Sequence, residues 1–311
     1  MVTTYSRGRK QRIDSLVNSG DEGTSLLADA WVRLKASPLF WVGAVILAIF
    51  ILLAILAPWI APHDPGAQLL IDQTSRARNA IAPSQPGFPL GGDTQGRDLL
   101  SRMIVGARQT LIVGILATVL GLIGGLILGI LAGAFGGWVD TVIMRVVDVM
   151  LSIPSLLLAI SIAVLFANPS LTTVIIAVSI VQIPVFARLL RGQMLAQRES
   201  DHVLAARALG VKRSAIVFRH MVPNSLSPVI VQATLVVATS ILDAAALSFL
   251  GLGSQDSSQP EWGQMLGEAQ STIDSHPQLA FWPAGAIIVV VLGFTLVGEA
   301  IREAIDPKNR R

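Results

Sequence analysis

Six apolar stretches constrain this chain more than any other feature. Each approaches or exceeds the ~20 helical residues needed to cross a hydrocarbon layer of about 30 Å. Because backbone polar groups in lipid must be satisfied internally, we predict that all six are helices. The expected fold class is therefore an all-α integral membrane protein with six transmembrane helices. The stretches are Leu39–Ala57, Leu111–Phe135, Val149–Ala167, Leu171–Ala187, Leu226–Leu250 and Leu279–Val297.

The composition agrees with a membrane protein. Hydrophobic residues make up 52% of the 311 and charged residues only 14%, whereas a typical soluble domain has about 25% charged residues. A formal charge of only +3 does not indicate a nucleic-acid partner. The chain has no cysteine, which excludes disulfides, thiolate metal sites and cysteine nucleophiles. Its four histidines are scattered without metal-ligand spacing, so we expect no metal site.

Lys and Arg in the connections predict the orientation, because cytoplasmic loops are enriched in them. The N-terminal tail holds six, the segment Arg188–Arg219 seven and the tail Arg302–Arg311 four, whereas loop 251–278 holds none. We therefore expect both termini in the cytoplasm, although five arginines between residues 58 and 110 run against the rule. The expected divisions are a tail at 1–38, a first transmembrane helix at 39–60, an extracytoplasmic segment at 61–110, a five-helix core at 111–300 and a tail at 301–311.

The N-terminal tail carries one amphipathic stretch. Leu27, Ala30, Trp31 and Leu34 fall on one helical stripe, with basic residues at its end. Such a stretch suits an interfacial helix on the membrane or a docking helix for a partner, and the sequence does not choose between them. We expect residues 1–24 to be disordered.

Residues 91–98 read GGDTQGRD and raise the question of a phosphate-binding loop. A P-loop reads GxxxxGK[ST], in which the lysine reaches the terminal phosphates and the hydroxyl binds magnesium. Here Arg97 and Asp98 occupy those places, and a carboxylate would repel phosphate. The run does not follow a hydrophobic strand, and the predicted orientation places it outside the cell. We conclude that it is not a nucleotide site.

The same residues suit a structural role. Asp93 or Thr94 could cap a short helix, and Asp98 is placed to face Arg102 four residues later. Nothing else in the chain resembles a nucleotide site, so any nucleotide energy must come from a partner.

Residues 197–224, between the fourth and fifth stretches, predict a cytoplasmic helix-turn-helix. The alanine-rich run ends at Gly210, which can take the positive φ that terminates a helix. Charged residues surround the apolar positions Val203, Ala206 and Leu209, so these cannot lie in lipid. A small apolar face flanked by basic residues suits a helix that lies in another protein's groove.

This segment resembles the EAA loop of ABC-importer permeases, whose pattern is EAA, three residues, Gly, nine residues, Ile, one residue, Leu-Pro. Ala205, Ala206, Gly210 and Pro223 match at the right spacing, and Pro223 also marks the expected boundary with the fifth stretch. Leu204 stands where the family has Glu.

Four further runs resemble the C-type permease of dipeptide and oligopeptide importers. Residues 92–102, GDTQGRDLLSR, resemble its GTDxxGRDxxSR run, and residues 247–253 its LSFLGLG. Residues 260–265 resemble its PxWGxM, and residues 298–307 its GDxLRDxLDP ending. The resemblance extends from about Leu27 to Arg311 in the same order.

The resemblance implies a type I ABC importer permease of the bacterial cytoplasmic membrane, with a coupling helix at about 198–219. A second homologous permease would form a heterodimer with this chain, two cytoplasmic ATPase subunits would bind beneath, and an extracytoplasmic substrate-binding protein would deliver the solute. ATP and magnesium would be bound by the ATPases, so this chain would carry no cofactor and would not be an enzyme. The residues expected to meet the ATPase are Leu204, Ala205, Ala206, Arg207, Gly210 and Pro223.

Glycines recur every fourth residue in the second stretch, at Gly121, Gly125, Gly129 and Gly133. Such ladders of small residues let helices approach closely in lipid. The neighbour could be another helix of this chain, which is the favoured interpretation, or, from the resemblance, the second permease.

Asp243 is the only carboxylate well inside an apolar stretch, where a charge is costly and usually faces a cavity or a counter-charge. It could contact a substrate amine, or make a structural hydrogen bond to a neighbouring helix, which we favour. Pro154 and Pro184 are expected to kink the third and fourth helices. The other polar residues that could line a pathway are Gln182, Gln232, Thr239 and Ser240.

Three functional classes were weighed. A permease subunit accounts for the spans, the cytoplasmic helix and the missing nucleotide site. A secondary carrier for a small polar solute would show matching halves and several buried charges, and an intramembrane hydrolase would need a nucleophile and base within reach. Peptides lead as substrates by resemblance, with nickel chelates or glutathione-like molecules as alternatives.

Overall fold

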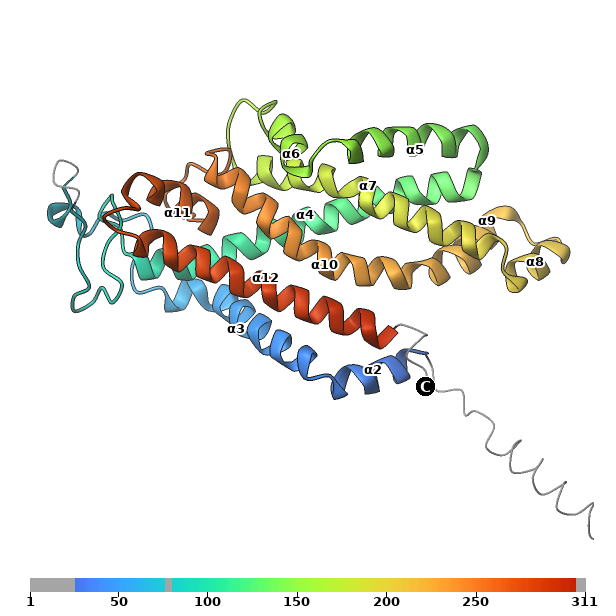
Figure 1. Cartoon of the computed structure of the whole chain (residues 1–311), viewed down its shortest axis with the longest axis horizontal. Coiled ribbons are helices and arrows are strands. Elements are labelled where there is room, and N and C mark those ends of the chain that lie inside the picture. Colours follow the sequence, from blue (N-terminus) through green and yellow to red (C-terminus); the bar gives the residue numbers. More distant parts are fainter. Residues whose placement is uncertain (1–25, 76–79, 306–311) are drawn as a thin grey trace, which may run out of the picture.

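The computed structural model describes residues 26–75 and 80–305, and every regular element in that part of the chain is a helix (Figure 1). Extended backbone pairs there only as three isolated bridges between residues 75 and 98. The predicted all-α fold class is therefore confirmed. The disorder predicted for residues 1–24 and most of the tail at 301–311 fall outside the described residues.

The long helices follow one another with short connections. The elements are α2 (Leu26–Ala36), α3 (Pro38–Ile60), η1 (Ile71–Gln73), α4 (Leu99–Phe135), α5 (Gly137–Ser152), α6 (Ser155–Ala163), α7 (Leu171–Arg198), α8 (Asp201–Ala208), α9 (Arg213–Ala215), the π-helical η2 (Ile216–Met221), α10 (Val222–Phe249), α11 (Trp262–Ala269), η3 (Gln270–Thr272) and α12 (Gln278–Ile305).

Side-chain caps explain where two of the long helices begin. Ser37 precedes α3, and its Oγ accepts a hydrogen bond from Phe40 N at 3.4 Å. Pro38 follows at the first helical position, where a missing N–H costs nothing. Ser170 precedes α7 and accepts a hydrogen bond from Thr173 N at 3.1 Å. Each cap satisfies a donor that the first helical turn leaves without a partner.

Five helices are long and apolar enough to cross a membrane, and the bent pair α5–α6 supplies a sixth candidate. The five are α3, α4, α7, the uninterrupted run Arg213–Phe249 and α12. The number of predicted crossings therefore agrees with the structure, but the third has different bounds.

The third stretch is bent at Pro154, as predicted, but its helical bounds differ from the predicted Val149–Ala167. The helical chain begins at Gly137, stops at Ser152 and turns by 98° into α6. Ile153 is extended, with φ −91° and ψ 131°, because the ring of Pro154 disfavours a helical residue before it. The charged residues of α5 hid its first half from a search for apolar runs.

Other helix ends extend past the apolar stretches. The helix α4 begins at Leu99 instead of Leu111, and α7 continues through Pro184 to Arg198. Pro223 lies in the first turn of α10, next to the predicted boundary, although the helical run begins earlier, at Arg213. The π-helical η2 lies directly before α10. Hydropathy marks only the part of a helix that meets lipid, whereas the backbone hydrogen bonds continue beyond it.

The helices α4, α7 and α10 form the middle of the bundle, with α3 and α12 along one edge and α5 and α6 along the other (Figure 1). The bundle has an α11 end, which carries α11 and residues 61–75 and 80–98, and an α8 end, which carries α8 and α9. The short helix α2 packs beside α12. Trp31 on α2 is 52% exposed.

The glycine ladder of α4 faces α7. A Cβ added at Gly121 would lie 2.8 Å from Gln182 Cβ, and one at Gly129 would lie 2.9 Å from Leu190 Cβ. Gly125 meets Phe186 and Gly133 meets Met194 in the same way. Side chains at these four positions would drive the two backbones apart. The ladder thus serves a contact within this chain.

Candidate functional site

Four of the five polar residues expected to line a pathway meet at one cavity of about 680 Å³ between α5, α6, α7 and α10. Gln182 comes from α7, and Gln232, Thr239 and Asp243 come from α10. The remaining lining is largely apolar and includes residues 150–155 around the bend between α5 and α6. The cavity therefore combines a largely apolar lining with a few convergent polar groups, which is typical of sites that bind small solutes.

Asp243 faces this cavity with an amide as its partner. Gln182 Nε2 donates a hydrogen bond to Asp243 Oδ2 at 3.4 Å, joining α10 to α7. No ion pair in the described part of the chain involves Asp243. The carboxylate thus makes the expected interhelical hydrogen bond and is also open to a cationic group in the cavity.

Ser240 lies apart from the other four. Its hydroxyl is fully buried and receives a hydrogen bond from Thr118 Oγ1 at 3.0 Å, which ties α10 to α4. Consecutive residues of a helix point about 100° apart, so Thr239 and Ser240 cannot share a face. The expectation that Ser240 lines the cavity was wrong for this reason.

The helix α8 projects from the bundle at the end opposite α11 (Figure 1). Gly210 follows it with φ +75°, as predicted, and the N–H of Val211 donates to the carbonyl of Ala206 at 3.1 Å. Nothing lies within 4 Å of a Cβ built on Gly210. The backbone conformation, and not a lack of space, therefore favours glycine here.

The exposed face of α8 is not the predicted one. Val203 and Ala206 are buried in a cluster with Ile216 and Val217, because η2 folds back over them. Leu204 and Leu209 are 42% and 84% exposed. Of the residues expected to meet an ATPase, Ala206 is buried, and the exposed ones are Leu204, Ala205, Arg207, Gly210 and Pro223.

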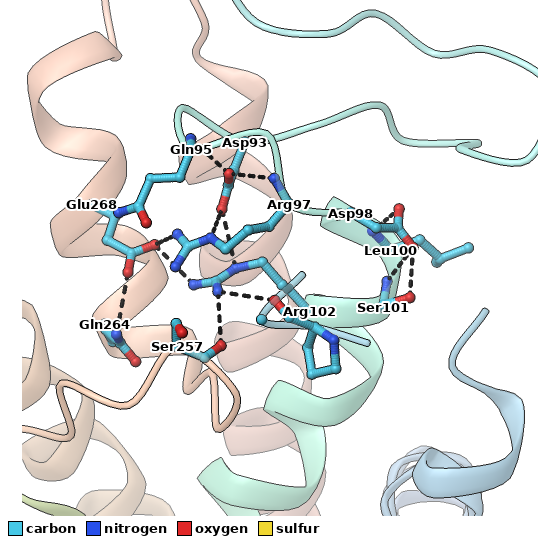
Figure 2. Close-up of polar contacts among 12 residues, drawn as sticks. Asp93, Gln95, Arg97, Asp98, Leu100, Ser101, Arg102, Ser257, Gln264 and Glu268 are labelled. Atoms are coloured by element: carbon cyan, nitrogen blue, oxygen red, sulfur yellow. Dashed lines mark hydrogen bonds and ion pairs between the residues drawn. The ribbon is translucent and has the colours of Figure 1, made fainter. Parts of the chain in front are cut away.

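The GGDTQGRD run forms a buried ionic cluster at the α11 end (Figure 2). Arg97 Nε lies 2.6 Å from Asp93 Oδ2, and Arg97 Nη2 lies 2.6 Å from Glu268 Oε2. Arg102 Nη2 lies 2.8 Å from Glu268 Oε2, and Arg102 Nε lies 3.3 Å from Asp93 Oδ2. The two arginine side chains are 2% and 0% exposed. Two positive and two negative groups thus join the segment before α4 and the first turn of α4 to α11.

Asp93 and Asp98 have other roles than expected. Asp93 Oδ1 accepts hydrogen bonds from the N–H groups of Gln95 and Arg97, so it organises a turn and does not cap a helix. Asp98 is itself the cap of α4 and accepts from Ser101 N at 3.2 Å. Its carboxylate contacts His63 Nδ1 at 3.1 Å, and not the side chain of Arg102.

Glu268 was not identified from the sequence. Its partners Arg97 and Arg102 lie 171 and 166 residues away along the chain, so no local spacing connects them. The excess of two arginines, Arg97 and Arg102, over Asp93 was the only signal in the sequence that a further carboxylate was needed.

The long apolar helices, and the cavity of about 680 Å³ between them, define a multi-pass integral membrane protein with a solute-sized site. Residues 125–311 match the family model of binding-protein-dependent transport system inner membrane components, and residues 25–83 match the N-terminal transmembrane domain of oligopeptide transport permease C. The chain therefore belongs to the family of ABC-importer permeases, as a C-type subunit, which confirms the predicted membership.

Several relatives cover nearly the whole chain. The dipeptide transport system permease protein DppC of Alkalihalophilus pseudofirmus is 43% identical over 282 residues, covering 91% of this chain and 90% of that protein. The probable D,D-dipeptide transport system permease protein DdpC of Escherichia coli is 42% identical, covering 88% and 89%. The glutathione transport system permease protein GsiD of Shigella flexneri is 41% identical, covering 89% of each chain.

Two solved structures share the fold. An inward-facing structure of the MetNI methionine ABC transporter matches with a TM-score of 0.55 and 19% identity, covering 66% of this chain and 96% of that one. An amino acid ABC transporter with histidines matches with a TM-score of 0.51 and 18% identity, covering 64% and 91%.

Proposed function

We propose that this chain is one of two permease subunits of an ATP-driven importer and that its substrates are di- or oligopeptides. A second homologous permease completes a heterodimer, two ATPase subunits bind at the α8 end, and a binding protein docks at the α11 end. ATP and magnesium are bound by the ATPases. The relatives named for dipeptide and glutathione transport support this choice of substrate.

The connection between α8 and the cavity carries the proposal. The helix α8 joins α7 to the run Arg213–Phe249. The helix α7 contributes Gln182 to the cavity. The run Arg213–Phe249 contributes Gln232, Thr239 and Asp243. A push on α8 therefore reaches two walls of the cavity along continuous helices, as a coupling element requires.

The same arrangement supports an orientation with the α8 end and both termini in the cytoplasm. The segment Arg188–Arg219 brings seven basic residues to the α8 end. Two of the five arginines that run against the rule, Arg97 and Arg102, are buried and paired with Asp93 and Glu268. These two arginines are neutralised within the fold, so they count less against the predicted orientation than the sequence suggests.

Reconstitution in proteoliposomes tests the function. The permease pair, the ATPases and the binding protein are expected to take up a labelled dipeptide only with ATP. Uptake driven by an ion gradient, with this chain alone in the membrane, would identify a secondary carrier and overturn the proposal.

Gly210→Pro tests the coupling. Proline fixes φ near −65° and removes the N–H that donates to Arg207 O at 3.1 Å, so we expect loss of ATPase co-purification with normal membrane insertion. Gly210→Asn is the matched control, because asparagine tolerates positive φ. If the proline variant retains ATPase at wild-type stoichiometry, α8 is not the docking element.

A further inference from the structure

A polar stripe runs along the exposed face of α5 beyond the cavity. Thr141, Arg145, Asp148 and Ser152 are spaced four, three and four residues apart. At 100° per residue they fall within a sector of about 60°. Ser152 lines the cavity that holds Asp243, so the stripe continues from that cavity toward the α8 end.

Two members of the stripe are charged. Asp148 Oδ1 accepts a hydrogen bond from Arg188 Nη2 of α7 at 2.5 Å, and both side chains remain about half exposed, at 54% and 53%. Arg145 is also exposed and makes no ion pair within residues 26–75 and 80–305. These groups were missed in the sequence because they precede the apolar stretch assigned to the third span.

The packing of α4 on α7 gives the depth of this ion pair in the bundle. Gly125 meets Phe186 and Gly129 meets Leu190. Arg188, midway between the two α7 residues, therefore lies level with the middle of residues 125–129 on α4.

At that level the exposed surface of α4 is apolar. Ile123, Ile127 and Leu131 are 49%, 55% and 37% exposed. The apolar stretch continues to Phe135, which is eight residues past Ile127, or about 12 Å along the helix. This depth therefore lies within the apolar part of a membrane-crossing helix.

An exposed ion pair cannot face hydrocarbon at the same depth without a large cost. The face of α5 that carries Asp148, with Arg188 beside it, must therefore face a water-filled space or polar groups of the partner permease. Its continuity with the cavity favours the water-filled space.

We infer that this stripe lines the inner half of the translocation pathway and that the guanidinium of Arg145 receives the carboxylate of the passing solute. The inference rests on the proposed function, because it assumes that the solute crosses between two permeases. Peptides and glutathione-like molecules carry both an ammonium and a carboxylate group. Asp243 in the cavity suits the first, and Arg145 suits the second.

Single-cysteine labelling tests the placement, since the chain has no cysteine of its own. In the assembled transporter, cysteines at Thr141 and Ser152 should react with 2-sulfonatoethyl methanethiosulfonate at least about tenfold faster than matched controls, because the anionic reagent does not enter hydrocarbon. The controls are Val142, Val146 and Val149 on the same helix, which are 53%, 54% and 57% exposed. They point about 60–140° away from Thr141 and Ser152. Equal or reversed labelling would overturn the inference.

Dipeptide uptake tests the role of Arg145. Arg145→Gln should lower ATP-driven uptake by about tenfold with normal ATPase co-purification. Arg145→Lys should recover part of it, since lysine keeps the positive charge but not the forked geometry of the guanidinium. Uptake by the glutamine variant at the wild-type rate would refute the carboxylate contact. If the labelling or the uptake result contradicts the inference, ATP-driven uptake by the wild-type transporter would still support the proposed function. The two proposals can therefore be refuted independently.

Discussion

Replacing Arg102 by methionine removes one guanidinium from the cluster in Figure 2 and leaves Asp93 and Glu268 with only Arg97. Arg102 is fully buried. Stranding a buried charge in this way costs about 3–5 kcal/mol. The Glu268 side chain is 25% exposed, so water relieves part of the penalty and we expect the lower end, about 3 kcal/mol.

Thermal unfolding of the purified complex at a fixed scan rate measures this loss. About 3 kcal/mol corresponds to a fall in Tm of roughly 5 °C for a chain of this length. The matched control is Arg108→Met on the same helix, because Arg108 is exposed and surface changes usually stay within about 0.5 kcal/mol.

The double variant Arg102→Met with Glu268→Gln separates charge balance from side-chain volume. It leaves one carboxylate, on Asp93, opposite one guanidinium, on Arg97, so we expect it to recover a large part of the lost stability. An unchanged Tm for Arg102→Met, or strictly additive losses in the double variant, would refute the account of the cluster as a neutral buried clamp.

Two further outcomes follow from packing and burial. Gly125→Leu places a side chain against Phe186, where even a Cβ has no room, so we expect loss of folded protein by size-exclusion chromatography, whereas Gly285→Ala, with open space around its Cβ, should be tolerated. Burial raises the pKa of the Glu261 carboxyl, so the folded state keeps this proton to a higher pH than the unfolded chain does. The free energy of unfolding should therefore fall as pH rises between the ordinary carboxyl pKa and the raised one. Tm measured against pH should show that slope in the wild type and a flatter one in Glu261→Gln.

Much of the architecture could be predicted from local patterns. Apolar run length and the cost of unpaired backbone groups in lipid account for the number of crossings. The positive φ of Gly210 and the face of the glycine ladder also follow from short-range requirements, because each depends on one residue's backbone freedom or on a fixed helical repeat.

The candidate site could be predicted only in part. Polar residues rare enough to stand out in an apolar run, such as Gln182 and Asp243, do line the cavity. Ser240 does not line the cavity, because the packing of α10 on α4 turns its side chain toward α4. The charged stripe on α5 was not predicted, because Arg145 and Asp148 interrupt the apolar run by which a membrane helix is recognised.

The sequence by itself determined that this chain is a helical membrane protein, because lipid imposes the same demand on every crossing segment. Its short motifs, such as residues 92–102 and 247–253, indicated the family. Only the tertiary structure decided which side chains meet. Glu268 reaches Arg97 and Arg102, and η2 covers Val203. Such contacts depend on how helices far apart in the chain are placed in space, and helical periodicity carries no information about that placement.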